Sequence, residues 1–316
     1  MTVSLRRSTA GGTGGVGAIG RTVPSLAMTD RPVSPGDRPP GTAVHPSPPV
    51  PPPDPDALVD LARDVAGRAV DLLLSGLHRS RVRVETKSTA TDMVSEMDRA
   101  SEDLIVSALL AERPGDGIVA EEGSARTGTS GLRWVIDPLD GTTNYLYDFP
   151  GWAVSIAAED DAGVVAGVVA DAVHREVFTA TRGGGARRDG EPIACSDCDD
   201  LATALVGTGF GYGADRRAAQ AVVLTGVLPR VRDIRRMGAA AVDLCSVACG
   251  RLDAYYERGL AWWDLAAGGL VASEAGEVVS GIDRGPLRAG SVLAAAPRLA
   301  TPLRDLLRSL GAQDVS

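Results

Sequence analysis

Apolar residues recur every three to four positions where the ordered part of the chain begins, a period that predicts an amphipathic helix from about Asp56 until Gly76 ends it. A second helix is predicted from about Ser95. The apolar positions of the two helices are Leu58, Leu61, Ala62, Val65, Ala69, Leu72 and Leu73, then Met97, Leu104, Ile105, Ala108 and Leu109. Residues 1–52 have no such period and are rich in Gly and then Pro, a composition that predicts a disordered tail.

Short apolar runs that end in acids follow the two helices. "GIVAEEG" (117–123) and "RWVIDP" (133–138) are typical of strands, and residues 153–190 predict an antiparallel meander with a hairpin at Asp189-Gly190. After about residue 200, strand patterns alternate with helix patterns. The sequence therefore predicts stacked layers of helix and sheet, with an α+β half over 53–190 and an α/β half over 191–316.

Composition and charge exclude several classes of protein. The net charge of −9 argues against binding of nucleic acid through a basic surface. No apolar run reaches the roughly 18 residues that span a membrane, and residues 1–27 lack the apolar core of a secretory signal, so a cytoplasmic protein is expected. Four cysteines form two close pairs, Cys195/Cys198 and Cys245/Cys249, which we interpret as incidental thiols because no matching set of histidines accompanies them.

The segment "WVIDPLDGTTNY" (134–145) carries the candidate chemistry. Pro138 stops strand pairing directly after Asp137, so Asp137 and Asp140 can converge on one side of a turn. The following Gly-Thr-Thr begins a helix, whose free N–H groups attract anions. Acids beside an anion site would repel the anion unless cations lay between them, and hard oxygen ligands favour Mg²⁺. The alternative, that the acids only cap a helix, explains one of them but not the similar placement of Glu121 and Asp264.

Five ordered blocks of the sequence resemble the inositol monophosphatase family. They are "KSTATDMVSEMD" (87–98), "AEEG" (120–123), "WVIDPLDGTTNY", "IRRMGAAAVDLCSVACGRLDAYYERG" (234–259) and "WDLAAGGLVASEAG" (263–276). The resemblance implies an α-β-α-β-α sandwich, a homodimer, and Mg²⁺-dependent, lithium-sensitive hydrolysis of a small phosphate ester. The expected substrate is myo-inositol 1-phosphate.

The resemblance also implies roles for individual residues. Glu121, Asp137 and the Leu139 carbonyl would hold one Mg²⁺, with Asp137, Asp140 and Asp264 around a second and a third ion near Glu121. Asp98 and Thr142 would share a hydrogen bond and orient the attacking water, with Glu121 counted beside them as catalytic. The substrate contacts would be Gly141, Thr142, Gly238, Ala239, Ala240, Glu257 and Asp264. Glu122 would not be a ligand, and Asp92 receives no role.

Several alternatives stay open at this point. Lys87 is either a phosphate or metal neighbour or a solvated lysine, and Arg235 and Arg236 are either substrate contacts or surface charges. "GTGFGY" (207–212) lacks a full dinucleotide-binding pattern and is interpreted as a strand and a bend. Fructose-1,6-bisphosphatase, histidinol-phosphate phosphatase and 3′-phosphoadenosine nucleotide phosphatase activities share the fold, and a non-catalytic regulatory protein could also retain it.

Overall fold

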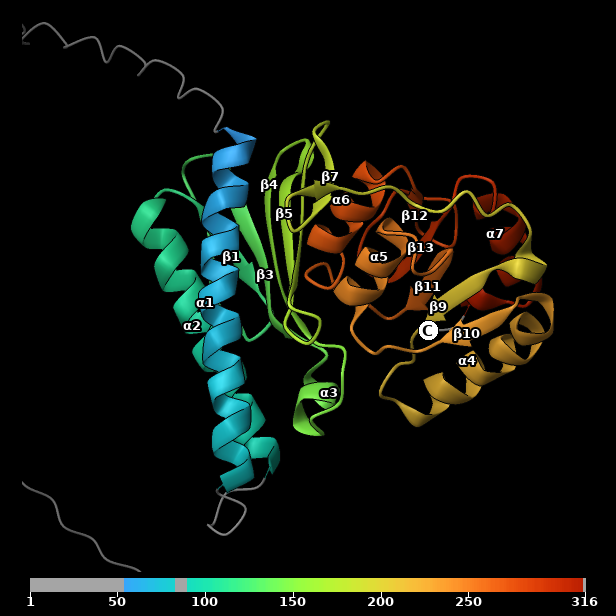
Figure 1. Ribbon diagram of the computed structural model, residues 1–316, viewed down its shortest axis with the longest axis horizontal. Coiled ribbons are helices and arrows are strands. Elements are labelled where there is room, and N and C mark those ends of the chain that lie inside the picture. The colour runs from blue at the N-terminus through green and yellow to red at the C-terminus, as the bar shows by residue number, and fades with distance from the viewer. Residues whose placement is uncertain (1–53, 83–89, 315–316) are drawn as a thin grey trace, which may run out of the picture. The chain divides into compact units, whose positions relative to one another are not determined.

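A computed structural model describes residues 54–82 and 90–314, which lie in one compact unit (Figure 1). It opens with two long helices, α1 (Pro55–Val82) and α2 (Ala90–Glu112). The prediction that Gly76 ends the first helix is wrong, because α1 continues for six more residues. A side chain at Gly76 would bring its Cβ within 2.6 Å of the Tyr145 hydroxyl, so the glycine serves close packing and not helix termination.

The first sheet has eight strands in the order β2-β1-β3-β4-β5-β6-β7-β8. Strands β1 and β3 are parallel and every other neighbouring pair is antiparallel, so β4 to β8 form the predicted meander. The strands are β1 (Gly117–Ala120), β2 (Ala125–Arg126), β3 (Arg133–Asp140), β4 (Ala153–Asp160), β5 (Gly163–Asp171), β6 (Glu176–Thr181), β7 (Gly185–Arg188) and β8 (Glu191–Pro192), with the short helix α3 (Thr142–Leu146) between β3 and β4.

The second sheet has five strands in the order β10-β9-β11-β13-β12. Its strands are β9 (Leu205–Thr208), β10 (Asp233–Arg235), β11 (Ala254–Arg258), β12 (Val278–Ser280) and β13 (Ser291–Ala295). The helices of this region are α4 (Ala214–Val227), α5 (Ala240–Ala248), α6 (Ala266–Glu274) and α7 (Ala300–Ser309), with 3₁₀ turns η1 (Leu201–Thr203), η2 (Leu228–Arg230) and η3 (Ala312–Asp314).

Alternation along the strands builds a core on each side of both sheets. In β3, Trp134 and Ile136 pack against α1 and α2, whereas Val135 between them packs against α5 and α6. In β11, Tyr255 faces the layer of α5 and α6, whereas Tyr256 faces the hydrophobic core that α4 and α7 cover. The layers therefore follow the order helix, sheet, helix, sheet, helix (Figure 1), which confirms the predicted fold class.

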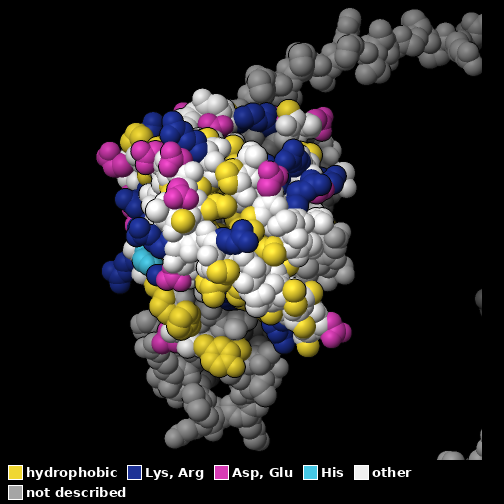
Figure 2. Space-filling view, turned by 90° about the vertical axis from the view of Figure 1, so that its right-hand side faces the viewer, with side chains coloured by type: hydrophobic (Ala, Val, Ile, Leu, Met, Phe, Trp, Pro, Cys, Tyr) yellow, Lys and Arg dark blue, Asp and Glu magenta, His cyan; other side chains and the backbone are white. Residues whose placement is uncertain are grey.

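The surface and the thiols add little chemistry of their own. On the face seen in Figure 2, basic and acidic side chains are interspersed. None of the described helices is both long and apolar enough to cross a membrane. All four cysteines are free thiols, and Cys245 is buried in the core between the sheets.

Glu277 is a buried acidic residue directly before β12. It is 7% exposed, and neither carboxyl oxygen has a hydrogen-bond partner among the described residues. Burial raises the pKa of Glu277 well above its ordinary value. As the pH rises, the unfolded chain therefore loses this proton first. The protonated Glu277 therefore contributes to the free energy of unfolding. This contribution is complete below the unfolded-state pKa and is lost as the pH rises through the folded-state pKa.

Replacing Glu277 by glutamine is accordingly expected to stabilise the protein more at higher pH, because glutamine does not ionise. The melting temperature of the variant minus that of the wild type should be larger at pH of about 8 than at about 4.5, close to the pKa of an unfolded glutamate. Taking the difference between the two proteins cancels the titration of every other acid. An equal difference at both pH values would contradict the assignment.

Candidate active site

Four acids from distant parts of the sequence line one cavity of about 260 Å³ at the junction of the two sheets. They are Glu121, Asp137, Asp140 and Asp264. The parallel pairing of β1 and β3 sets Ala120 opposite Ile136, so Glu121, just after β1, and Asp137, within β3, lie at the same level of the sheet. Most of the apolar residues earlier in each strand are buried in the core. The first acidic residue after each apolar run lines the cavity.

Backbone N–H groups hold three of the carboxylates in place. Asp137 accepts a hydrogen bond from the amide of Leu139 at 3.0 Å, within an irregularity of the β3–β4 pairing that spans Asp137 to Asp140. Asp140 accepts from the amides of Ala240 and Ala241 at 3.2 and 2.7 Å. Asp264 accepts from the amide of Ala261 at 2.6 Å. These bonds orient the three carboxylates in the structure.

The acids are crowded enough to alter one another's protonation. Burial first, and then neighbouring carboxylates, raise the pKa of Asp137 and of Asp140 well above the ordinary value. Burial also raises the pKa of Asp264 and of Glu121, and Glu121 is hydrogen-bonded to Asp137 although the residue as a whole is exposed. Crowded carboxylates of this kind share protons when no cation separates them.

The donor set fits a hard divalent cation. In the described ranges, no three acidic, histidine or cysteine side chains already form an arrangement that could hold a metal ion. Asp137 is instead hydrogen-bonded to both Glu121 and Asp264. Oxygen ligands of this charge are those that Mg²⁺ takes, and a cation would replace the shared protons.

Asp98 reaches the acidic cluster from α2. It is 4% exposed, and its Oδ1 has no hydrogen-bond partner in the described part of the chain. Burial, followed by the charges of Glu122 and Glu121, raises the pKa of Asp98 to about 8. The expected hydrogen bond between Asp98 and Thr142 is not formed. The Thr142 hydroxyl donates to the carbonyl of Leu139 at 3.0 Å, an acceptor within its own turn.

The turn before α3 requires a glycine. Gly141 has a φ of +89°, and a Cβ there would lie 2.6 Å from the carbonyl oxygen of Gly151. Gly141 and Thr142 both line the cavity, next to Asp140. The N-terminal end of this short helix is therefore open to the space between the acids, as the sequence predicts.

The cavity lining also includes Gly238, Ala240 and Glu257. Glu257 accepts a hydrogen bond from the Tyr255 hydroxyl at 2.5 Å. Burial raises the pKa of Glu257 to about 7, against the lowering effects of Tyr255 and Arg236. Ala239 is 2% exposed and is not among the lining residues.

Ala239 is the N-cap of α5, where its side chain makes no capping hydrogen bond. Asp140, a hundred residues earlier, binds the free amides of that helix instead. The carboxylate of Asp140, from the first sheet, therefore caps the N-terminus of α5.

Sequence reasoning missed part of the cavity lining. Phe210, Gly211 and Tyr212 follow β9, so "GTGFGY" is a strand and a bend as predicted, but the bend borders the cavity. Their convergence depends on how the second sheet packs, which no local pattern signals. The other residues that sequence reasoning did not place are Arg216, Arg258, Gly259, Leu260, Ala261 and Trp263. Of these, only Trp263 could have been predicted to line the cavity, because it is adjacent to Asp264 in the sequence.

The remaining candidates separate clearly. Glu122 lies outside the cavity lining, and its carboxylate pairs with Arg99 at 3.5 Å. Of the arginine pair, Arg235 forms an ion pair with Asp233 at 2.7 Å, whereas Arg236 lines the cavity. Next to Trp263 of the cavity lining, Trp262 donates to Glu159 at 2.7 Å and packs, partly buried, against the core between the sheets. Lys87 and the side chain of Asp92 lie outside the described residues.

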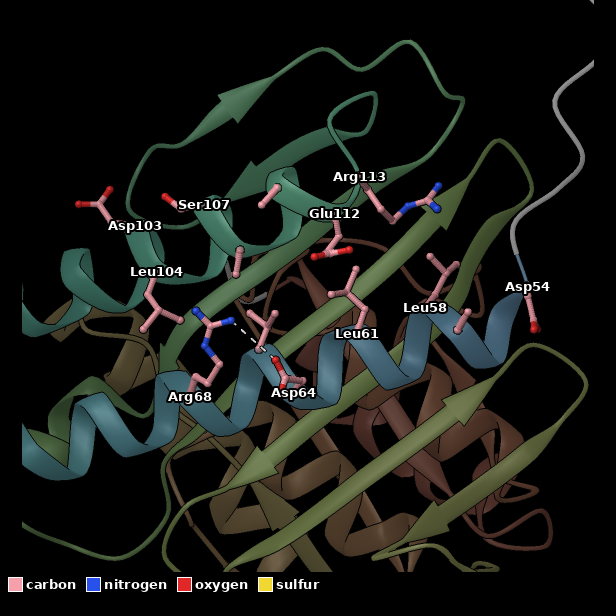
Figure 3. Close-up of a pocket in the computed structure, with 14 residues that line it drawn as sticks. Asp54, Leu58, Leu61, Asp64, Arg68, Asp103, Leu104, Ser107, Glu112 and Arg113 are labelled. Atoms are coloured by element: carbon pink, nitrogen blue, oxygen red, sulfur yellow. Dashed lines mark ion pairs between the residues drawn. The ribbon is translucent and has the colours of Figure 1, made fainter.

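A larger hollow, of about 970 Å³, lies between α1 and α2 (Figure 3). Its charged residues come from both helices, and Arg68 is paired with Asp64 at 3.7 Å. The cavity on which the four acids converge is much smaller, at about 260 Å³. Size alone therefore does not identify the site.

Comparison with known proteins agrees with this geometry. The sequence model of the inositol monophosphatase family matches residues 54–311. An inositol-1-monophosphatase of Mycobacterium leprae is 48% identical over 231 residues, which are 70% of this chain and 79% of that protein. The structure of Mycobacterium tuberculosis SuhB matches with a TM-score of 0.71 and 40% identity, covering 81% of this chain and 98% of that one. A protein of Pasteurella multocida named Nus factor SuhB is 37% identical over 77% of this chain and 92% of its own length.

Proposed function

The chain belongs to the inositol monophosphatase family and is a phosphoric monoester hydrolase, and we propose that it hydrolyses myo-inositol 1-phosphate with two to three Mg²⁺ ions. The observation that carries the proposal is the convergence of Glu121, Asp137, Asp140 and Asp264 on one cavity. The name of the Mycobacterium leprae relative supports the choice of substrate.

The acids would divide the work of binding the ions. Glu121, Asp137 and the carbonyl of Leu139 would hold one Mg²⁺, and Asp137, Asp140 and Asp264 a second, with a third near Glu121. When bound, the ions supply charge neutralisation of the phosphoryl oxygens and a water of lowered pKa. Asp140 and Asp264 are oriented by backbone amides, whereas Glu121, Asp137 and Asp264 would have to give up their mutual hydrogen bonds to bind an ion.

Other residues of the chain would bind the ester and orient the nucleophile. The amides of Gly141 and Thr142 would receive the phosphoryl group at the start of α3. Asp98, buried and with an unpaired oxygen, and Thr142 would orient the attacking water. For Thr142, this requires its hydroxyl to leave the carbonyl of Leu139. Glu257 would accept a hydrogen bond from a substrate hydroxyl, with Gly238 and Ala240 beside it.

The expected partners are therefore a small phosphate ester and a second copy of the chain, and not nucleic acid. The net charge of −9 disfavours binding of a phosphate backbone, and on the face seen in Figure 2 basic and acidic side chains are interspersed.

Two alternatives remain within the fold. Another phosphatase of the family would use the same acids with a different alcohol. A non-catalytic regulatory protein is the second, since the Pasteurella multocida relative is named a Nus factor. Loss of one acid of the cluster would favour it, but all four and Asp98 are present.

Phosphate release by the purified protein is expected to require Mg²⁺ and to fall with lithium. The measurement is inorganic phosphate released from myo-inositol 1-phosphate, with Mg²⁺, with added Li⁺, and with excess chelator. Chelation leaves the acids crowded and without the ions that bind the phosphoryl group. Undiminished hydrolysis in excess chelator would refute the metal mechanism.

A further inference from the structure

Strand β11 carries two neighbouring tyrosines whose side chains lie on opposite faces of the second sheet. Tyr255 packs in the core beside α5 and α6, and Tyr256 packs in the core that α4 and α7 cover. Because side chains alternate along a strand, Glu257 lies on the same face as Tyr255. A fully buried tyrosine and an acid that lines the cavity are therefore neighbours on one face of the sheet.

The hydroxyl group of Tyr255 is hydrogen-bonded to the carboxyl group of Glu257. It donates to Oε2 at 2.5 Å. Burial, followed by the charges of Glu257 and Asp243, raises the pKa of Tyr255 well above its ordinary value, so the hydroxyl keeps its proton and remains a donor. Hydrogen bonds from a neutral donor to an ionised acceptor are among the stronger ones in proteins.

Two glycines of the neighbouring strand make room for this pair of side chains. Tyr255 is paired with Gly207 of β9, where an added Cβ would lie 3.2 Å from the Cδ2 atom of the tyrosine ring. At Gly209, directly after β9, an added Cβ would overlap the carboxyl group of Glu257. The carboxyl group therefore rests against the backbone at Gly209 and is bonded by the hydroxyl of Tyr255 at one oxygen.

Packing alone does not require a buried tyrosine to bond to an acid of the cavity. The buried Tyr145 satisfies its hydroxyl with a backbone carbonyl, that of Leu73, at 2.7 Å. The hydroxyl of Tyr255 bonds instead to a carboxyl group that lines the cavity, although Tyr255 itself is absent from the lining. A glutamate side chain has several rotamers, and a bond at one oxygen selects among them. The orientation of Glu257 is thus set before an ester binds.

We propose that Tyr255 is a positioning residue, which holds the carboxyl group of Glu257 in the orientation that accepts a hydrogen bond from a hydroxyl group of the substrate alcohol. This inference rests on the proposed function, in which Glu257 contacts the alcohol. Discrimination between hydroxylated and apolar alcohols then depends on a side chain outside the cavity lining. An acceptor that is already oriented binds its donor without a further loss of side-chain entropy.

Two esters with the same six-membered ring test the inference, because myo-inositol 1-phosphate carries hydroxyl groups and cyclohexyl phosphate has none. Tyr255→Phe keeps the ring and should lower kcat/KM for the inositol ester by about tenfold, chiefly by raising KM. For cyclohexyl phosphate the change should be about twofold or less. Gly209→Ala should have the same two effects, because its methyl group displaces the same carboxyl group. Tyr256→Phe is the matched control: it loses a hydroxyl bonded to Thr208 on the opposite face and should leave both esters unaffected.

A double-mutant cycle, which needs only the inositol ester, assigns the effect to Glu257. Glu257→Ala should itself lower kcat/KM, and adding Tyr255→Phe to it should cost about twofold or less. The inference is overturned if Tyr255→Phe has no effect, if it lowers both esters alike, or if its full effect persists without the Glu257 carboxyl group. It is also overturned if Glu257→Ala has no effect. The proposed function fails separately, if the wild type releases no phosphate from the inositol ester in a Mg²⁺-dependent way.

Discussion

Asp137→Asn is expected to lower kcat by about a thousandfold or more, because one change removes a charge that both principal Mg²⁺ ions would share. Asp137 is 1% exposed, and in the structure it contacts the carboxyl groups of both Glu121 and Asp264. Asparagine has the same shape, retains one oxygen and is neutral, so the geometry of the strand end should survive.

Thermal unfolding separates the catalytic effect from a folding defect. Burial and neighbouring acids raise the pKa of Asp137, so an ionised carboxylate there is unfavourable without a cation. In chelator, the variant should therefore melt at the same temperature as the wild type or higher. Added Mg²⁺ should raise the melting temperature of the wild type far more than that of the variant, because ligand binding stabilises only a folded site that binds it. An equal rise in both proteins would remove Asp137 from the ligand set.

Glu121→Gln is expected to lower kcat/KM by about a hundredfold, and Glu122→Gln by about threefold or less. The carboxyl group of Glu121 is hydrogen-bonded to Asp137 in the cavity. Glu122, the next residue, lies outside the cavity lining, and its carboxylate pairs with the largely exposed Arg99. An ion pair at the surface contributes little, so its loss should not reach the reaction.

This adjacent pair provides its own control for charge. Both changes remove one negative charge from the same turn, so a general effect on the field of the cavity would lower both activities alike. Steady-state kinetics of the two variants with one ester at saturating Mg²⁺ make the comparison. Similar losses in the two would mean that the ligand is misassigned.

The acidic cluster could be predicted from the sequence because each acid follows a local pattern. Glu121 and Asp137 end apolar runs, and parallel pairing of two such strands brings their ends together. The arginines that line the cavity had no comparable pattern. Arg216 and Arg217 are adjacent in one helix, and only the packing of α4 against the loop after β9 decides which of them enters the cavity.

Two glycines show where sequence reasoning was insufficient: one was wrongly predicted to end a helix, and the other lies against a carboxylate that the sequence did not place beside it. Gly76 resembled a helix end, but it lies inside α1 because Tyr145, from a helix far along the chain, needs the space. In "GTGFGY", Gly209 leaves room for the carboxylate of Glu257, which lies close to where its Cβ would be. In both cases the partner is distant in sequence, so the local pattern alone does not reveal why a side chain is absent.

The hydrogen bonds of Asp140 to Ala240 and Ala241 have a consequence for how the protein becomes active during synthesis. Asp140 belongs to the first sheet, and the amides that fix it belong to a helix translated a hundred residues later. Asp264, from a still later segment, is the last acid of the cluster to be made. A nascent chain that has completed the first sheet thus has three of the four acids but neither the amides that hold Asp140 nor the fourth carboxylate. Catalytic competence therefore requires that synthesis has passed both the start of α5 and Asp264.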